Sequence, residues 1–187
     1  PAVHAVLDQR LAPTSAAPLA VALSGGGDSL ALLILTLDWA RRHGRRVHAL
    51  VFDHALHPDS AAWTSFALAA ARGRGAEADS LRGSAPRPAA GLPAAARAAR
   101  HAALAERARE MGAGVLLMGH TGDDRMEAAA MRVEGGSVSD PREWAPSPAW
   151  PQGRGLFVLR PLLDVRRADL RAFLRARGET WLEDPAN

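Results

Sequence analysis

Short apolar runs alternate with longer segments of helical periodicity along most of the chain. The apolar runs, which are bounded by turn residues, are predicted to be strands at residues 19–24, 46–53, 76–82, 115–120 and 156–162. The periodic segments are predicted to be helices at residues 28–43, 59–73, 93–111, 121–133 and 165–177. Strands and helices that alternate in this way form a parallel sheet with helices on both faces. We therefore expect an α/β fold with an open, five-stranded parallel sheet of the Rossmann-like type.

Two stretches rich in Pro and Gly interrupt this alternation, at residues 83–93 and 135–155. Periodic structure resumes after each of them, so we interpret both as loops of one domain, residues 1–187, rather than as domain linkers. Long loops without secondary structure are usually functional or mobile. We expect both loops to flank the binding cleft.

Composition narrows the classes of function. The chain of 187 residues contains no cysteine, which excludes disulfides, thiolate zinc sites and a thiol nucleophile. Its 23 basic residues are all arginine, and the net charge of +3 permits nucleic-acid binding without demonstrating it. No apolar run is long enough to span a membrane and no signal pattern is visible, so we expect a cytoplasmic protein without a membrane partner.

Polar residues gather after the predicted strands. In parallel sheets ligands bind beyond the carboxyl ends of the strands, because the following loops converge there. The residues at these ends are Ser24 to Ser29, Asp53, His54, His120, Asp124, Glu127 and Arg160. The sequence thus predicts one site at this edge of the sheet.

The segment SGGGDS, residues 24–29, joins the first predicted strand to the first predicted helix. Glycine backbone N–H groups at a helix N-terminus bind phosphate, and the two serines add hydroxyl donors. The Walker loop requires a lysine, which this chain lacks, and the dinucleotide fingerprint requires glycine where Leu30 stands. A nucleophile elbow around Ser24 fits except at its first position, but the chain has no matching oxyanion segment. A phosphate loop is the interpretation that we favour.

This segment also resembles the SGGxDS pyrophosphate loop of the N-type ATP pyrophosphatases. Within that superfamily, further segments are similar to motifs of the bacterial tRNA(Ile)-lysidine synthetases, in the same order along the chain. They are VFDHALHPDS (VDHxLRxxS), GLPAAARAARHAAL (LExxARxxRYxxL), GHTGDDRMEA (HHxDDxxET), RPLLDVRRADL (RPLL) and WLEDPAN (W-x-ED-x-(S)N). The matches run from Leu19 to Asn187.

The resemblance implies a sheet of the adenine nucleotide alpha hydrolase type and a specific reaction. ATP would adenylate cytidine 34 in the CAU anticodon of tRNA(Ile), and L-lysine would then displace AMP to form lysidine. ATP and Mg²⁺ are the implied cofactors, and tRNA(Ile) and L-lysine the implied partners. The family's additional tRNA-binding domains have no counterpart in the 187 residues, so we expect a catalytic domain alone. The oligomeric state stays open, a homodimer included.

Roles for single residues follow from the motifs and from the resemblance together. The triphosphate would lie over Ser24, Gly25, Gly26, Gly27 and Ser29, with Asp28 available to Mg²⁺. Asp124 and Glu127 stand three apart, a spacing suited to an ammonium group, and the resemblance assigns them to lysine, with Asp124 also near Mg²⁺. Arg100, favoured over Arg97 by the resemblance, would contact phosphate or the activated intermediate. His120 would contact phosphate or act as a base, and Asp53 and His54 would line the adenosine side.

Five positions depart from the family's pattern. His57 stands where the family usually has arginine, and His101 where it has tyrosine. Thr121 replaces the second histidine of its motif, Arg125 a common glutamine and Ala128 a threonine.

Two other functions remain open on the residues alone. A metal-dependent phosphohydrolase would use a cluster of six residues, namely Asp53, His54, His57, His120, Asp123 and Asp124. A non-catalytic adenine-nucleotide-binding module would need the glycine loop but not Asp124 and Glu127. Bound transition metal would favour the first alternative, and ATP binding without pyrophosphate release would favour the second.

Overall fold

The computed structural model describes residues 2–53, 57–82, 92–136 and 140–183, with the backbone alone at 92–94. A sheet of six strands runs through its centre in the order β3-β2-β1-β4-β6-β5. The strands are β1 (Leu19–Ala22), β2 (Val47–Asp53), β3 (Glu77–Arg82), β4 (Val115–Leu117), β5 (Trp144–Pro146) and β6 (Phe157–Leu159). All neighbouring pairs are parallel except β5 and β6, which are antiparallel.

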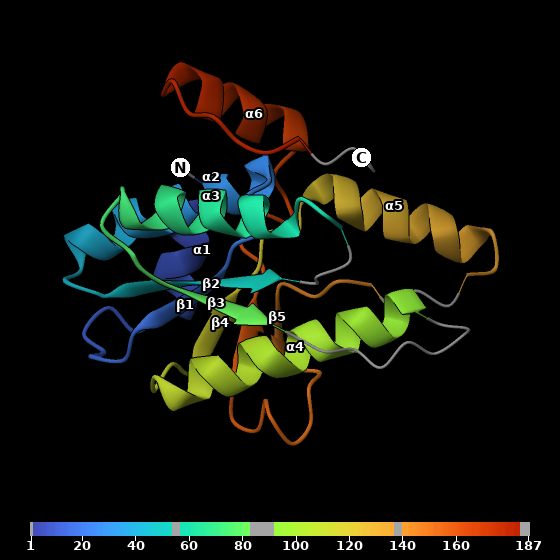
Figure 1. The fold of residues 1–187 in the computed structure, drawn as a ribbon, viewed down its shortest axis with the longest axis horizontal. Coiled ribbons are helices and arrows are strands. Elements are labelled where there is room, and N and C mark those ends of the chain that lie inside the picture. The colour runs from blue at the N-terminus through green and yellow to red at the C-terminus, as the bar shows by residue number, and fades with distance from the viewer. Residues whose placement is uncertain (1, 54–56, 83–91, 137–139, 184–187) are drawn as a thin grey trace.

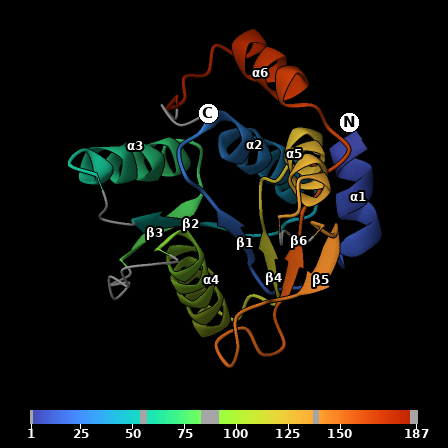
Figure 2. The ribbon, with the colours of Figure 1, turned by 90° about the vertical axis from the view of Figure 1, so that its right-hand side faces the viewer.

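Within the described residues, six helices accompany the sheet (Figure 1). They are α1 (Ala2–Arg10), α2 (Gly27–Arg42), α3 (Ser60–Arg72), α4 (Leu92–Glu110), α5 (Gly122–Val133) and α6 (Arg167–Ala176). Figure 2 shows α4 on one face of the sheet, with α2, α3 and α6 on the other. The five predicted helices and the α/β class are therefore confirmed. None of the described helices has the length and apolar character needed to cross a membrane.

The sheet has six strands rather than the five predicted. The additional strand, β5, lies within residues 135–155, which the sequence analysis treated as one irregular loop. Its three residues include Pro146 and show no alternation, so the pattern gives no signal. Pairing with β6 creates the strand: Trp144 lies opposite Leu159, and its ring stacks on that of Phe157 with centroids 4.9 Å apart. Proline is tolerated there because β5 is an edge strand.

Helix α1 was not predicted either. Only two of its residues, Val3 and Leu7, are buried, which is too few to give a clear helical period. Packing against α2 stabilises it, and the indole Nε1–H of Trp39 donates to Asp8 Oδ1 over 2.6 Å.

Two hydrophobic cores result from the alternation of side chains across the sheet. In β1, Leu19 and Val21 join the core formed with α1, α2, α3 and α6, whereas Ala20 faces the core formed with α4. The smaller core contains Leu104 of α4 against Leu116 of β4. Because both faces are covered, the central strands β1 and β4 read as continuous apolar runs.

The strand order reverses between β1 and β4, which is where ligands bind in open α/β sheets. Val21 of β1 lies opposite Leu117 of β4 in the parallel register. The chain leaves β1 into the glycine loop and leaves β4 toward α5 at the same edge. The topology thus brings residues 24–29 and 120–127 together.

Candidate functional site

The glycine loop is organised by its two serines. The Ser29 hydroxyl donates to the carbonyl of Gly26 over 3.0 Å and accepts the backbone N–H of Ser24 over 3.2 Å. The two hydroxyl oxygens are 3.0 Å apart, and Ser24 Oγ accepts the N–H of Gly26 over 3.3 Å. These bonds fix the turn before α2 begins at Gly27.

The first two glycines of the loop differ in what their backbone positions require. Gly25 has φ of +90°, which side-chain-bearing residues rarely adopt, and an added Cβ would lie 2.8 Å from Leu182 Cδ1. Gly26, the N-cap of α2, has an ordinary φ of −70°, and a Cβ there would approach nothing closer than 3.5 Å. The fold therefore does not demand glycine at residue 26.

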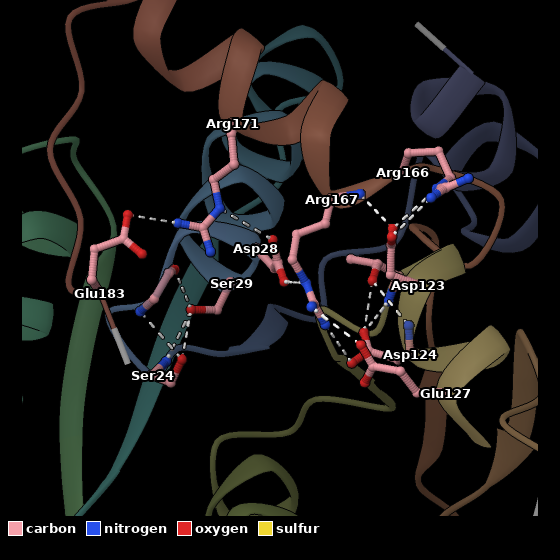
Figure 3. A network of polar contacts seen from close by, with 12 residues as sticks. Ser24, Asp28, Ser29, Asp123, Asp124, Glu127, Arg166, Arg167, Arg171 and Glu183 are labelled. Atoms are coloured by element: carbon pink, nitrogen blue, oxygen red, sulfur yellow. Dashed lines mark hydrogen bonds and ion pairs between the residues drawn. The ribbon is translucent and has the colours of Figure 1, made fainter. Parts of the chain in front are cut away.

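The loop lies directly against the end of β4. A Cβ on Gly119 would be 3.2 Å from both the nitrogen and the Cα of Ser29, which is tighter than ordinary contacts. This close approach brings the start of α2 near the start of α5, and Figure 3 shows Asp28 of α2 and Asp124 of α5 both in contact with Arg167.

Arg167 of α6 lies at the centre of the site (Figure 3). Its Nε is 3.2 Å from Asp28 Oδ2, its Nη2 is 3.1 Å from Asp124 Oδ1, and its Nη1 is 3.3 Å from Glu127 Oε1. Burial disfavours the charge of this guanidinium, but the three carboxylates outweigh burial and raise its pKa. One cation thus joins α2, α5 and α6.

The two aspartates at the start of α5 have structural partners as well. Asp124 forms a capping box with Thr121, because its Oδ2 accepts the Thr121 N–H and hydroxyl over 2.6 and 2.8 Å. Asp123 accepts the backbone N–H of Arg167 over 2.7 Å and pairs with Arg166. The N–H bond lowers the pKa of Asp123 and holds the start of α6 on α5. Thr121 is therefore a helix cap here.

Asp28 combines burial with an oxygen that accepts no hydrogen bond within the described residues. Its Oδ2 faces Arg167, whereas its Oδ1 is buried and accepts no hydrogen bond within the described part of the chain, with Arg171 Nε 3.9 Å away. Burial raises the pKa of Asp28, and the two arginines oppose that effect. This oxygen therefore has an ion-pair partner, Arg171, but accepts no hydrogen bond within the described residues.

The segment after α6 packs against the glycine loop. The N–H of Leu182 donates to the carbonyl of Gly25 over 3.0 Å. Glu183 binds both Arg171 and the indole N–H of Trp181, and the Arg171 guanidinium lies 5.1 Å from the Trp181 ring centroid. The C-terminal motif thus supports the glycine loop.

A cluster of arginine and histidine side chains lies where β4 and β6 end. Helix α4 contributes Arg97, Arg100 and His101 to it, and His120 and Arg160 follow the two strands. His101 is 5% exposed, and its Nδ1 has no hydrogen-bond partner among the described residues. Burial, followed by the charges of Arg100, Arg97 and Arg160, lowers the pKa of His101 to about 4. Arg100 has a buried Nε without a described partner, and burial lowers its pKa too. Such unpaired donors suit an anionic ligand.

The metal-cluster alternative gains no support from the described residues. No group of three or more His, Asp or Glu side chains among them could hold a metal ion. Asp53 is the last residue of β2 and is 6% exposed. Its Oδ2 lies 3.5 Å from Nε of Arg82. His54 lies outside the described residues.

Sequence reasoning missed Arg167, Arg171, the capping box of Thr121 with Asp124, and the contact of Asp123 with the start of α6. The capping box has a local signal, a threonine followed three residues later by an acid before a helix. Arg167 has no such signal, because its partners lie 40 to 139 residues away in the chain. Only the tertiary contacts reveal it.

The buried His101 predicts acid sensitivity. Its pKa is about 4 in the folded chain and near 6.5 when unfolded, so its contribution to stability is present above pH 6.5 and is lost as pH falls toward 4. Between pH 6.5 and 5, the unfolding free energy of His101→Asn should decrease less steeply with falling pH than that of the wild type. The difference in slope should be roughly 1 kcal/mol per pH unit. Urea denaturation across this range measures it, and equal slopes in both proteins would contradict the assignment.

Solved structures with this fold include two enzymes of different chemistry. The U34-tRNA thiolase NcsA from Methanococcus maripaludis aligns with a TM-score of 0.77 at 16% identity, over 98% of this chain and 65% of that one. The NH3-dependent NAD synthetase from Campylobacter jejuni aligns with a TM-score of 0.58 at 12% identity, over 94% and 69%. These likenesses establish the fold alone.

Curated relatives are more similar in sequence. A tRNA(Ile)-lysidine synthase from Caulobacter vibrioides is 62% identical over 185 residues, which are 99% of this chain and 45% of that protein. Proteins of the same name from Hyphomonas neptunium and Thermus thermophilus are 46% and 39% identical, over 91% and 95% of this chain and 47% and 33% of their own lengths. The chain thus spans at most about half of these relatives. The model of the PP-loop domain family matches residues 2–187, so the chain belongs to the PP-loop domain family.

Proposed function

We propose that this chain is the catalytic domain of a tRNA(Ile)-lysidine synthase. It would adenylate cytidine 34 of the CAU anticodon, and join L-lysine to that base with release of AMP and pyrophosphate. One observation carries the proposal: beside the glycine loop, the guanidinium of Arg167 is bound by three carboxylates. They belong to Asp28, Asp124 and Glu127. The 62% identity to the Caulobacter protein supports the same conclusion.

ATP would bind with its phosphates over residues 24–29. Ser24 and Ser29 preform the turn, and a Cβ built on Gly26 would approach nothing closer than 3.5 Å, so space is left beside its backbone. Mg²⁺ prefers carboxylate and phosphate oxygens, and Oδ1 of Asp28, which accepts no hydrogen bond within the described residues, would fit that preference together with Asp124. When bound, the ion would neutralise charge on the triphosphate.

Lysine would be bound by the same carboxylates that hold Arg167. An ammonium group has three donors, and Asp124 and Glu127 already bind a cation with several N–H groups from adjacent positions. Arg167 must then release at least Glu127, which is the more exposed of the two partners. The amine of lysine could next attack C2 of the adenylated base, displacing AMP.

The cationic side of the site would face the anionic groups of the reaction. Arg100 and the ring of His120 come from α4 and the end of β4, and Arg100 has an unsatisfied donor. They would contact the phosphate of the activated intermediate, while Asp53 would line the adenosine side together with His54. A tRNA substrate would place the reaction in the cytoplasm.

Mass spectrometry of tRNA(Ile) with a CAU anticodon tests the proposal directly. After incubation with the protein, ATP and lysine, the tRNA should contain lysidine, and AMP and pyrophosphate should accumulate in equal amounts. ATP binding without pyrophosphate release would instead favour a nucleotide-binding module, and ATP hydrolysis without tRNA would favour a phosphohydrolase.

A Gly26→Val substitution should abolish ATP binding with little loss of stability. Its φ and its surroundings tolerate a Cβ, so any defect would come from the loss of close phosphate approach. Calorimetric titration with ATP and a thermal melt measure the two effects. The control, Gly25→Val, should also destabilise the fold because φ is +90° there. Unchanged ATP affinity in Gly26→Val would disprove the phosphate loop.

A Glu127→Gln substitution should weaken lysine use far more than ATP binding. It preserves shape but removes one charge-assisted contact, worth about 1.5–3 kcal/mol, or roughly ten- to hundredfold in apparent lysine affinity. Lysine is titrated at saturating ATP, and ATP at saturating lysine. Glu134→Gln, an exposed position at the end of the same helix, is the matched control. A defect confined to the ATP titration would reassign this carboxylate.

A further inference from the structure

Arg160 and His120 form a direct contact between the ends of β6 and β4. The Nε–H of Arg160 donates to Nδ1 of His120 over 3.2 Å. A guanidinium has donors only and cannot accept a hydrogen bond. Nδ1 must therefore carry a lone pair, and the proton of the neutral ring must be on Nε2.

Arg160 is held in place by groups outside the site. It is 8% exposed, its Nη1 donates to the carbonyl of Arg142 over 2.9 Å, and its backbone N–H donates to the carbonyl of Glu143 over 2.8 Å. The Glu143 carboxylate in turn pairs with Arg10 of α1 over 2.8 Å. The guanidinium is thus oriented by the segment before β5, independently of any ligand.

The other ring nitrogen is open to a partner. Nε2 of His120 makes no hydrogen bond within the described part of the chain, and this atom is not fully buried. The charged and titratable groups around the ring are Arg160 directly after β6, Asp124 on α5, and Arg97, Arg100 and His101 on α4. Burial and Arg160 lower the pKa of His120 to about 4, so the ring is neutral at pH 7.

Resting on the proposed function, we infer that Arg160 is a positioning residue that holds His120 as an Nε2–H donor toward the anionic group of the reaction. The only lone pair of the ring points at Arg160, so His120 cannot take a proton from the amine of lysine. Of the two roles open to this histidine, phosphate contact and base, the geometry selects phosphate contact. The deprotonation of lysine is then left to the carboxylate side of the site.

Nitrogen-15 NMR of the histidine rings tests this inference without ATP or tRNA. In protein labelled with [15N]histidine at pH 7, the His120 ring, assigned by its loss in His120→Asn, should show protonated Nε2 and an unprotonated, hydrogen-bonded Nδ1. In Arg160→Gln the Nδ1 signal should move to the position of a free lone pair. The pKa of His120 should rise by about one unit or more, since a cation in contact is removed.

Arg97→Gln is the matched control, because it removes a nearby charge from the exposed surface but leaves the contact to Nδ1 intact. It should raise the pKa less and leave the Nδ1 signal in place. A wild-type ring protonated on Nδ1 would overturn the inference even if Arg160→Gln fails to fold. Identical spectra of the two variants would also overturn it. Absence of lysidine formation, by contrast, would refute the proposed function and not this assignment.

Discussion

The contact of Arg167 with three carboxylates is the interaction on which the site depends. Like charges at the starts of α2 and α5 would repel one another, and a single guanidinium from α6 offsets that repulsion. Asp123 strengthens the arrangement by accepting the N–H of Arg167, so that α6 begins where its side chain is needed. Removing this cation would leave Asp28, with its raised pKa, beside Asp124 with only Arg171, 3.9 Å from Asp28 Oδ1, to offset its charge.

The site has an anionic and a cationic side. On the anionic side, three carboxylates surround Arg167, namely those of Asp28, Asp124 and Glu127. On the cationic side, arginines surround His101 and His120, and Asp124 is the carboxylate that acts on His120. The glycine loop lies against the start of this second group, because Gly119 lets the two backbones touch. An ammonium substrate and a phosphorylated one would thus meet opposite fields a short distance apart, as the proposed reaction requires.

Stability and binding draw on the same residues here. Asp124 caps α5 with one oxygen and holds Arg167 with the other, and the buried Arg160 binds the Arg142 carbonyl while it orients His120. Substitutions at these two positions would therefore change folding and chemistry together. Glu127 and Gly26 are cleaner probes, because one is exposed and the other has a backbone conformation open to any residue.

The sequence by itself determined the α/β class, five helices and five strands, and the glycine loop, because apolar periodicity and turn chemistry are local signals. It also predicted that residues 24–29 and 120–127 share one edge, since parallel strands end together. Tertiary structure alone decided β5, α1, Arg167 and the partner of His120. Each of these depends on contacts between distant segments, such as Arg160 with His120 or Trp144 with Phe157, and no spacing along the chain encodes them.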